Sequence, residues 1–414
     1  MADDKKAHLD VGLFQLRAER VEGLPLVSAR AYLRGGARLE PNPGWSYVTA
    51  RLLSEGTERR DYRELSEAAE ERGAWFQTSG SGETATVAVD AQSADAKWAL
   101  DHLLELLLEP TFPEDRLDWL RRQVVAELES QLDQPDVRTG YAFIDQLFSP
   151  HPYGRPIQGD AESLAALDPD ACRSLHQRSL GWGGCISVAG HIDPKQVVEA
   201  LADRLQALPK VMESMPESPS IVGDPNRREV DLPAGDQAHY FLGTTTVGRT
   251  HPDLAALELL GVVLGSGGLS GRLPLLLREK EGLAYHVEVA AAAGAGLDPG
   301  RFVVYLGTSK QLVAKAEALI YDQLTHLQKN GIADEELEEA RGYLLGRAPF
   351  RFETLRQRAE LMAEAALYGT QADDPDWWPS QLRAVTANDL ERVAKTWLEP
   401  EHMRVTVGLP SPKS

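Results

Sequence analysis

Two polar side chains in one short stretch, Arg278 and Tyr285, have the chemistry to stabilise a negatively charged oxygen. A guanidinium group is a permanent cation with forked donors, and a phenol hydroxyl is a single neutral donor. Gly282 lies between the two residues and predicts a chain reversal, so the guanidinium and the hydroxyl can converge on one ligand. Taken alone, the pair favours a plainer interpretation, in which Arg278 is a solvated charge at a helix end and Tyr285 a half-buried strand residue.

A glycine-rich loop precedes this pair. Residues 265–271 read GSGGLSG, and their glycines allow positive φ angles and a close approach by another chain. Leucines with flanking charges predict a helix over 272–280, and alternation predicts a strand from Tyr285 to Val289. The order of loop, helix, turn and strand predicts a binding loop next to the pair. Its candidate binding residues are Gly265, Gly267, Gly268, Ser270 and Gly271.

The uninterrupted run GGLSGRLPLLLREKEGLAYHV closely resembles the second-domain signature of the pitrilysin/insulinase-type zinc metallopeptidases, which include the mitochondrial processing peptidase. In that family the loop helps to hold substrate, and the Arg and Tyr of the REKxGLAY run reach the peptide group that is cleaved. The resemblance therefore implies catalytic roles for Arg278 and Tyr285. It extends over nearly the whole chain, from Pro25 through the HPYGRP segment at 151–156 to Val407.

Active members of this family carry HxxEH on the first long helix, shortly before a Gly-Thr pair. Two histidines on one helix face hold zinc, and the glutamate accepts a proton from the metal-bound water. Here Gly56-Thr57 is the pair, and counting back places Tyr47, Ala50 and Arg51 at the three positions. Ala50 offers no base and Arg51 is a cation that would repel zinc. We expect no metal site on this chain.

The third zinc ligand of the family is a glutamate on a later helix, and the family spacing places it at Glu127. One carboxylate cannot hold zinc alone, so this remnant is expected to form an ion pair, with Arg51 as the candidate partner. The ten histidines include no pair at i, i+3 or i, i+4 spacing, and no serine-hydrolase or phosphate-loop motif occurs in a suitable context.

Composition restricts the class of protein. The formal net charge of −20 argues against nucleic acid or an anionic membrane as partner and is compatible with cationic peptides. No apolar run approaches the ~20 residues of a membrane span. The start, MADDKKAHLDVG, lacks the apolar core of a signal peptide, which predicts a cytoplasmic location unless a leader has been removed, in which case the protein is periplasmic or exported. Cys172 and Cys185 are expected to be free buried thiols.

The order of predicted elements occurs twice. Helices over 45–54, 61–72, 94–108 and 113–132, with a hairpin over 75–90, are matched by helices over 251–264, 272–280, 311–329 and 334–347, with a hairpin over 285–308. Residues 12–34 read as a further hairpin, with its turn at Glu22-Gly23. Repetition of a whole set of elements indicates an internal duplication.

We therefore predict an α+β protein with two homologous domains, each a mainly antiparallel sheet covered by helices. Residues 1–208 form the first domain and 232–414 the second, and the proline-rich stretch 209–231 is the linker. The family resemblance implies that the two domains face each other as a clamshell.

The resemblance implies the catalytically incomplete subunit of a heteromeric zinc endopeptidase. In this interpretation a homologous HxxEH subunit carries the zinc, and this chain supplies the loop, Arg278 and Tyr285 to a peptide substrate. The chain is inactive alone and binds no cofactor. The alternative is a non-catalytic scaffold or peptide-binding protein of the same fold. Presence of both Arg278 and Tyr285 with the glycine loop favours the first interpretation.

Overall fold

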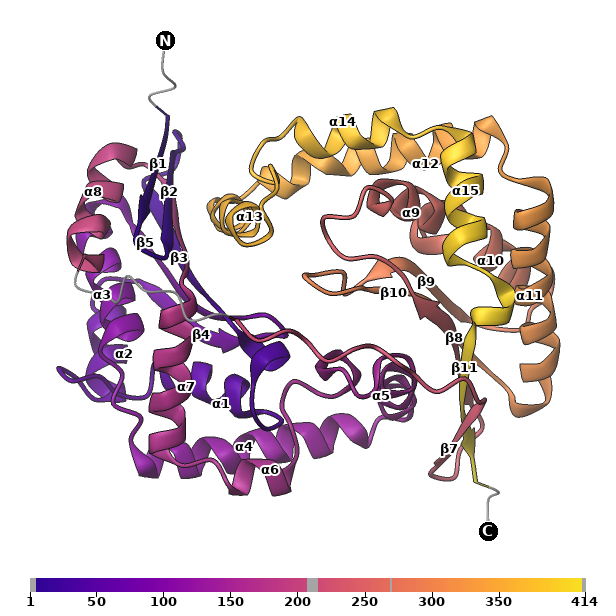
Figure 1. The fold of residues 1–414 in the computed structure, drawn as a ribbon, viewed down its shortest axis with the longest axis horizontal. Helices are drawn as coiled ribbons and strands as arrows, with labels where there is room; N and C mark the ends of the chain where they lie inside the picture. Colours follow the sequence, from indigo (N-terminus) through magenta and orange to yellow (C-terminus); the bar gives the residue numbers. More distant parts are fainter. Residues whose placement is uncertain (1–4, 207–214, 269, 412–414) are drawn as a thin grey trace. The chain divides into compact units, whose positions relative to one another are not determined.

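The computed structural model describes residues 5–206, 215–268 and 270–411, and these form two compact units. The first unit contains residues 1–128, 156–218 and 350–374, and the second contains 129–155, 219–349 and 375–414. Each unit is built around one β-sheet with helices on both faces (Figure 1). None of the helices in the described part of the chain has the length and apolarity that a membrane crossing requires.

The first sheet has six strands in the order β1-β2-β6-β3-β5-β4. All neighbours are antiparallel except the parallel pair of β2 and β6. Inward-facing Val, Ile, Leu and Ala alternate along these strands and fill the core of the unit. The strands are β1 (Lys6–Val11), β2 (Phe14–Arg20), β3 (Leu26–Arg34), β4 (Trp75–Gly80), β5 (Thr84–Gln92) and β6 (Gly184–Gly190).

The hairpin predicted over residues 12–34 is wrong. Both strands form, but β6 is inserted between β2 and β3, and β2 pairs instead with β1 and β6. The pattern of apolar residues located the strands correctly, whereas the neighbour of β2 comes from a segment more than 160 residues later in the chain. Local sequence carries no signal for such a distant pairing.

The second sheet has five strands in the order β7-β11-β8-β10-β9. Here β7 and β11 form the parallel pair, as β2 and β6 do in the first sheet, and the other pairs are antiparallel. The same order and directions in both sheets confirm the α+β class and the predicted duplication; β1 is an addition to the first copy. The strands are β7 (Arg228–Leu232), β8 (Ala238–Thr245), β9 (His286–Ala293), β10 (Arg301–Thr308) and β11 (Arg404–Pro410).

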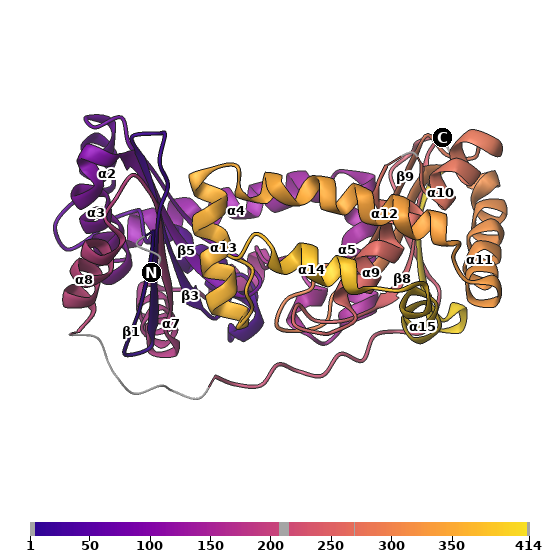
Figure 2. The ribbon, with the colours of Figure 1, turned by 90° about the horizontal axis from the view of Figure 1, so that it is seen from above.

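The helices of the first unit begin and end at clear sequence signals. Asp61 caps α2 in a capping box with Glu64, and Asp193 caps α8. Figure 2 shows α2, α3 and α8 on one side of the first sheet and α13 on its other side. The helices are α1 (Trp45–Leu52), α2 (Tyr62–Glu70), α3 (Ala96–Leu108), α4 (Glu114–Leu132), α6 (Ala161–Ala165), α7 (Pro169–Trp182), α8 (Pro194–Leu205) and α13 (Leu355–Tyr368).

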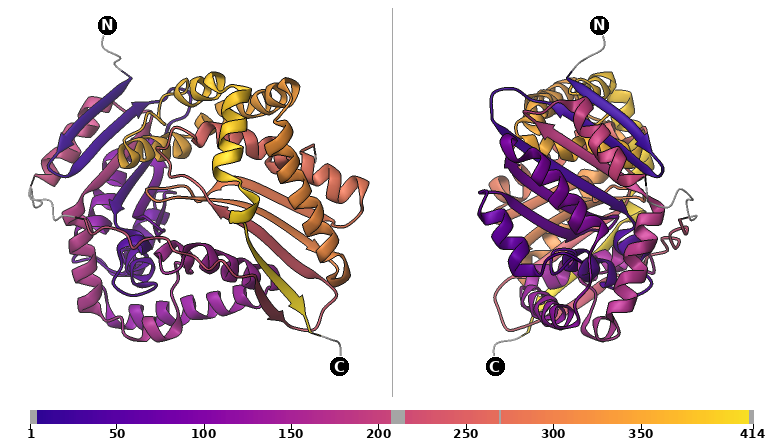
Figure 3. Two further views of the ribbon diagram at one scale, coloured as in Figure 1. Left: turned by 45° about the vertical axis from the view of Figure 1, so that its right-hand side comes forward. Right: turned by 90° about the vertical axis from the view of Figure 1, so that its left-hand side faces the viewer.

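The helices of the second unit repeat this plan. The left view of Figure 3 shows α11 and α15, orange and yellow, in front of the second sheet. The predicted helix over 272–280 is a short α-helix that continues as a π-helical turn, Leu275–Lys280. The helices are α5 (Pro135–Phe148), α9 (Leu254–Gly261), α10 (Arg272–Pro274), α11 (Val313–Asn330), α12 (Asp334–Arg347), α14 (Trp377–Ala384) and α15 (Ala387–Trp397).

The compact units differ from the linear division into 1–208 and 232–414, because each copy of the duplication gives one helix to the other unit. Helix α5 packs on β8 and β11 of the second sheet, and α13 packs on β3 and β6 of the first. The predicted linker also needs correction. Residues 209–214 lie outside the described residues, 215–227 contain no helix or strand, and β7 begins at Arg228.

Candidate functional site

The degenerate metal-site positions lie on α1, in the first unit. Tyr47 and Arg51 are one helical turn apart, and the Arg51 guanidinium lies over the Tyr47 ring at 5.6 Å from its centroid. Arg51 Nη1 donates to Glu127 Oε2 on α4 at 3.0 Å. The structure therefore contains the ion pair that the sequence suggested for the remnant glutamate.

The residues present at these positions do not fit zinc. A divalent cation needs lone pairs from Cys, His or carboxylate side chains, and Arg51 offers only donors and a positive charge. Its guanidinium already binds the one carboxylate that the family uses as a ligand. Across the described residues, no three His, Cys, Asp or Glu side chains lie close enough together to hold a metal ion.

Strand β4 fixes the position of α1. A side chain at Gly80 would lie 2.7 Å from the Tyr47 Cα, so only glycine lets the strand pack this closely against the helix. Thr78 Oγ1 donates to the Arg51 carbonyl at 3.1 Å and is 2.9 Å from Ser54 Oγ. The helix face that holds zinc in active members is therefore kept in place although the ligands are absent.

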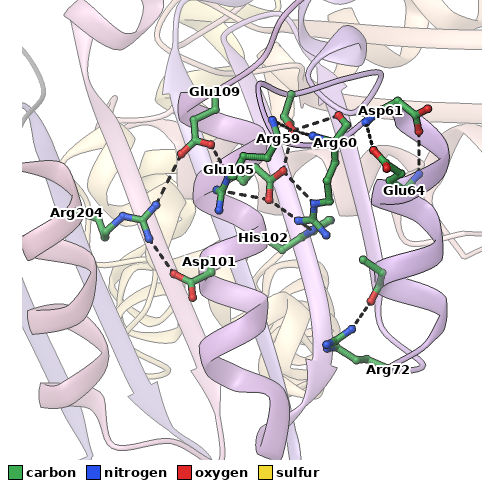
Figure 4. A network of polar contacts seen from close by, with 12 residues as sticks. Arg59, Arg60, Asp61, Glu64, Arg72, Asp101, His102, Glu105, Glu109 and Arg204 are labelled. Atoms are coloured by element: carbon green, nitrogen blue, oxygen red, sulfur yellow. Dashed lines mark hydrogen bonds and ion pairs between the residues drawn. The ribbon is translucent and has the colours of Figure 1, made fainter.

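A buried polar network anchors the loop that follows α1 (Figure 4). Glu105 on α3 is 1% exposed and accepts from Thr57 Oγ1 at 2.7 Å and from Arg60 Nε at 3.1 Å. Arg60 Nη2 also lies 3.0 Å from His102 Nδ1. Burial by itself would raise the pKa of Glu105, but the hydrogen bonds from Arg60 and Thr57 outweigh it. The pKa of Glu105 therefore lies below its usual value. Glu105 is therefore an ionised anchor.

The sequence patterns did not predict this network. Its only signal is a glutamate within the apolar run of α3, preceded on that helix by a histidine three residues earlier. A buried acid requires a partner, and two consecutive arginines, Arg59 and Arg60, follow the Gly-Thr pair. Arg59 completes the arrangement by donating from Nε to Glu109 at 2.6 Å.

The Arg278 and Tyr285 side chains meet in the second unit, as predicted. The guanidinium carbon of Arg278 lies 5.0 Å from the centroid of the Tyr285 ring, within cation–π range. Arg278 lies in the π-helical turn, and Tyr285 immediately precedes β9. Tyr285 is 82% exposed. A partly exposed cation, whose Nε also lies 3.5 Å from Glu279 Oε1, is thus held against the ring of an exposed tyrosine.

The glycine loop packs on itself. A side chain at Gly271 would lie 2.3 Å from the Gly265 Cα, and one at Gly265 would lie 2.9 Å from Cγ2 of Val289 in β9. Gly265 and Gly271 are buried, whereas Gly268 and Ser270 are exposed. The loop thus has a closed base and an exposed tip. Leu269 lies outside the described residues.

An ion pair fixes the end of this loop. Arg272 binds Glu336 of α12 through two parallel contacts, Nε to Oε1 at 2.7 Å and Nη2 to Oε2 at 2.6 Å. This fork holds the Glu336 pKa below its ordinary value, chiefly through the hydrogen bond from Arg272. The first residue of the helix that carries Arg278 is therefore anchored.

The fold and these residues define the class of this protein. It has the two-sheet fold of zinc peptidases, but its own zinc-binding positions hold side chains that cannot bind the metal. The chain matches the family model described as insulinase (peptidase family M16) over residues 24–161. It matches the model described as peptidase M16 inactive domain over residues 185–344. This chain belongs to peptidase family M16, the pitrilysin/insulinase family.

Several curated relatives cover most of the chain. An uncharacterized zinc protease of Streptomyces coelicolor is 26% identical, across 85% of this chain and 78% of that protein. A Helicobacter pylori protein named non-peptidase homolog YmxG is 25% identical, across 81% of this chain and 78% of that protein.

Solved structures agree in fold. A peptidase M16 inactive domain from Pseudomonas fluorescens has a TM-score of 0.86 at 22% identity and covers 99% of this chain and 100% of that chain. A protease from Helicobacter pylori has a TM-score of 0.86 at 17% identity, with 98% and 100% coverage. At these identities the likeness supports the fold alone.

Proposed function

We propose that this chain is the metal-free subunit of a heteromeric zinc endopeptidase and that it supplies Arg278 and Tyr285 to a peptide bound at the zinc of an HxxEH partner. The observation that carries the proposal is the cation–π pair of Arg278 with the exposed Tyr285, 5.0 Å from guanidinium carbon to ring centroid. A tyrosine with 82% of its surface exposed contributes little to the core, so its position next to a cation favours a role toward a ligand.

The chemistry of the pair suits peptide hydrolysis. The scissile carbonyl oxygen gains negative charge as water attacks, and donors held near it stabilise that charge more than the ground state. The Arg278 guanidinium binds a carbonyl oxygen with a fork of donors, and the Tyr285 hydroxyl adds a single donor. The glycine loop 265–271 lies on the same segment, and its exposed tip is available to the peptide backbone.

The zinc and the general base must come from the partner in this scheme. Arg51 bound to Glu127 leaves α1 without a ligand set, which supports the proposal that this chain holds no cofactor and is inactive alone. A chain that supplies only part of an active site needs a permanent partner. Permanent protein complexes typically bury well over ~1,600 Å² of surface at their interface. The charge of −20 favours basic peptides as substrates.

A second candidate is a non-catalytic scaffold or peptide-binding protein. The observation in its favour is the name of the Helicobacter pylori relative, non-peptidase homolog YmxG. In that case Arg278 and Tyr285 would bind a peptide or a neighbouring protein without chemistry.

Co-expression with the HxxEH homologue of the same genome tests the proposal. We expect a stable complex that hydrolyses a basic peptide, while each chain alone is inactive. A chelator should abolish the activity, and zinc should restore it. A partner that is fully active without this chain, or recovery of this chain only as a monomer from its native source, would overturn the proposal in favour of the second candidate.

A further inference from the structure

A groove in the second unit lies beside α11, over the strands β7 and β11. Its volume is about 490 Å³. The apolar part of its lining consists of Val313, Ala314, Ala318, Tyr321, Val407 and Leu409. Ala314 and Ala318 are exposed and one helical turn apart, so small side chains line one wall and leave room for a close neighbour.

The internal duplication shows what fills the equivalent space in the first unit. There α3 corresponds to α11, and the parallel strands β2 and β6 correspond to β7 and β11. Helix α8 packs on β1 and β2 and buries its apolar face, including Val197, Leu201 and Leu205. Arg204 of α8 donates to Asp101 of α3 at 2.9 Å, which places α8 beside α3. The corresponding place beside α11 is the groove.

The charges of the groove are of both signs. Arg227 and Glu317 form an ion pair at 2.7 Å on its wall. Glu229 on β7 and Lys310 before α11 also line it, and within the described part of the chain neither has an ion-pair partner. A segment with one uniform charge would be repelled by one of these groups. A helix with acidic and basic side chains beside its apolar face, as in α8, satisfies both.

We propose that this groove is the docking site for an amphipathic helix of a partner protein, which covers β7 and β11 as α8 covers β2. The chemistry of the occupant follows from the lining. It carries aliphatic side chains at three- and four-residue spacing, a basic side chain toward Glu229 and an acidic one toward Lys310. From Val313 to Tyr321, α11 rises about 12 Å, which accommodates between two and three turns. The inference does not depend on the proposed function.

The probe for this site is the helix that fills the equivalent space. A fluorescein-labelled peptide with the sequence of residues 193–205, stapled across its polar face to hold it helical, is titrated with the full chain, and fluorescence anisotropy is measured. We expect saturable binding. The double variant Ala314→Arg/Ala318→Arg fills the groove and should weaken binding at least 10-fold. Both alanines are exposed, so the fold should tolerate the change.

Matched controls separate the groove from other surfaces. Ala384→Arg places the same side chain on an exposed alanine of α14 and should leave binding unchanged. A peptide with Leu201→Asp should not bind. Absence of saturable binding, or equal binding by the groove variant, would overturn the proposal. So would a concentration-dependent dimer in sedimentation that Ala314→Arg/Ala318→Arg dissociates, because a second copy would then be the occupant.

Discussion

Arg51 on α1 and Glu127 on α4 face each other at 3.0 Å, so an ion pair joins two of the positions that hold zinc in active members of the family. In this chain Glu127 binds the guanidinium of Arg51 instead of a metal ion. Because Arg51 is 22% and Glu127 37% exposed, the pair is solvated and is expected to contribute at most about 1 kcal/mol. Its main consequence is that the glutamate remains in its place without a metal.

This arrangement predicts that the zinc site can be restored. In the triple variant Tyr47→His/Ala50→Glu/Arg51→His, α1 carries HxxEH and Glu127 is released from its partner. We expect about one zinc per chain, measured by elemental analysis after dialysis. Two imidazoles on one face of α1 and the Glu127 carboxylate on the neighbouring α4 then provide three zinc ligands. The unmodified chain should bind none.

The control keeps the arginine. Tyr47→His/Ala50→Glu leaves the Arg51 guanidinium on Glu127 and should bind no zinc, since the cation repels the metal and occupies the third ligand. If this double variant binds zinc as well as the triple variant does, the ion pair is not what excludes the metal.

The second prediction concerns Tyr285 in a complex with an HxxEH partner. Tyr285→Phe removes one hydroxyl and retains the ring on which Arg278 lies. We expect kcat for peptide hydrolysis to fall on the order of 10²-fold, roughly 3 kcal/mol, with assembly unchanged. Arg278→Ala should raise KM as well, because its charge also holds the ground-state peptide.

Size-exclusion chromatography of each mutant complex gives the control for assembly. If both variants assemble and hydrolyse peptide at the wild-type rate, Arg278 and Tyr285 are structural, and the scaffold function is correct.

Much of the local structure within residues 12–132 and 251–347 could be predicted from the sequence, whereas most elements outside these two ranges were not. The helix predicted over 334–347 has its observed bounds, Asp334–Arg347. The acidic residues of its first turn suit the helix dipole, and this signal lies within the helix itself. The repeat of elements, and with it the duplication, followed from the same patterns. Arg278 and Tyr285 were brought together correctly because only a turn separates them.

The features that the sequence did not predict depend on distant segments. The pairing of β2 with β6 joins Leu16 to Ile186, and no local pattern specifies a strand neighbour. The exchange of α5 and α13 between the units is equally non-local. In the polar network, Glu105 was read as part of an apolar helix, because its partner Arg60 becomes a neighbour only after folding.

The third prediction tests the closed base of the glycine loop. Gly271→Ala would put a methyl group 2.3 Å from backbone at Gly265, so backbone must move. We expect a loss of about 2 kcal/mol or more in the free energy of unfolding. Gly342→Ala is the matched control, because that glycine lies inside α12 with open space around it and should gain up to about 1 kcal/mol. Thermal unfolding of both variants measures the contrast; equal melting temperatures would contradict the tight packing.

The last prediction is a loss of stability in mild acid. Burial, and then the Arg60 cation, lower the pKa of His102 to about 4. Burial also lowers the pKa of His176 to about 4. The unfolded chain takes up these protons near the ordinary value of about 6.5, whereas the folded chain does so only near 4. Between these values the unfolded state binds more protons, so stability falls as pH decreases from about 6.5 to 4.

Urea unfolding at pH 7 and pH 5 measures this loss. Each histidine should contribute about 2 kcal/mol to the difference in unfolding free energy between the two pH values, because at pH 5 it is protonated in the unfolded chain and neutral in the folded one. His102→Gln removes one titrating group and should reduce the difference by about 2 kcal/mol, whatever its effect on stability at pH 7. A pH dependence that His102→Gln does not alter would show that His102 titrates in the folded protein as it does in the unfolded chain.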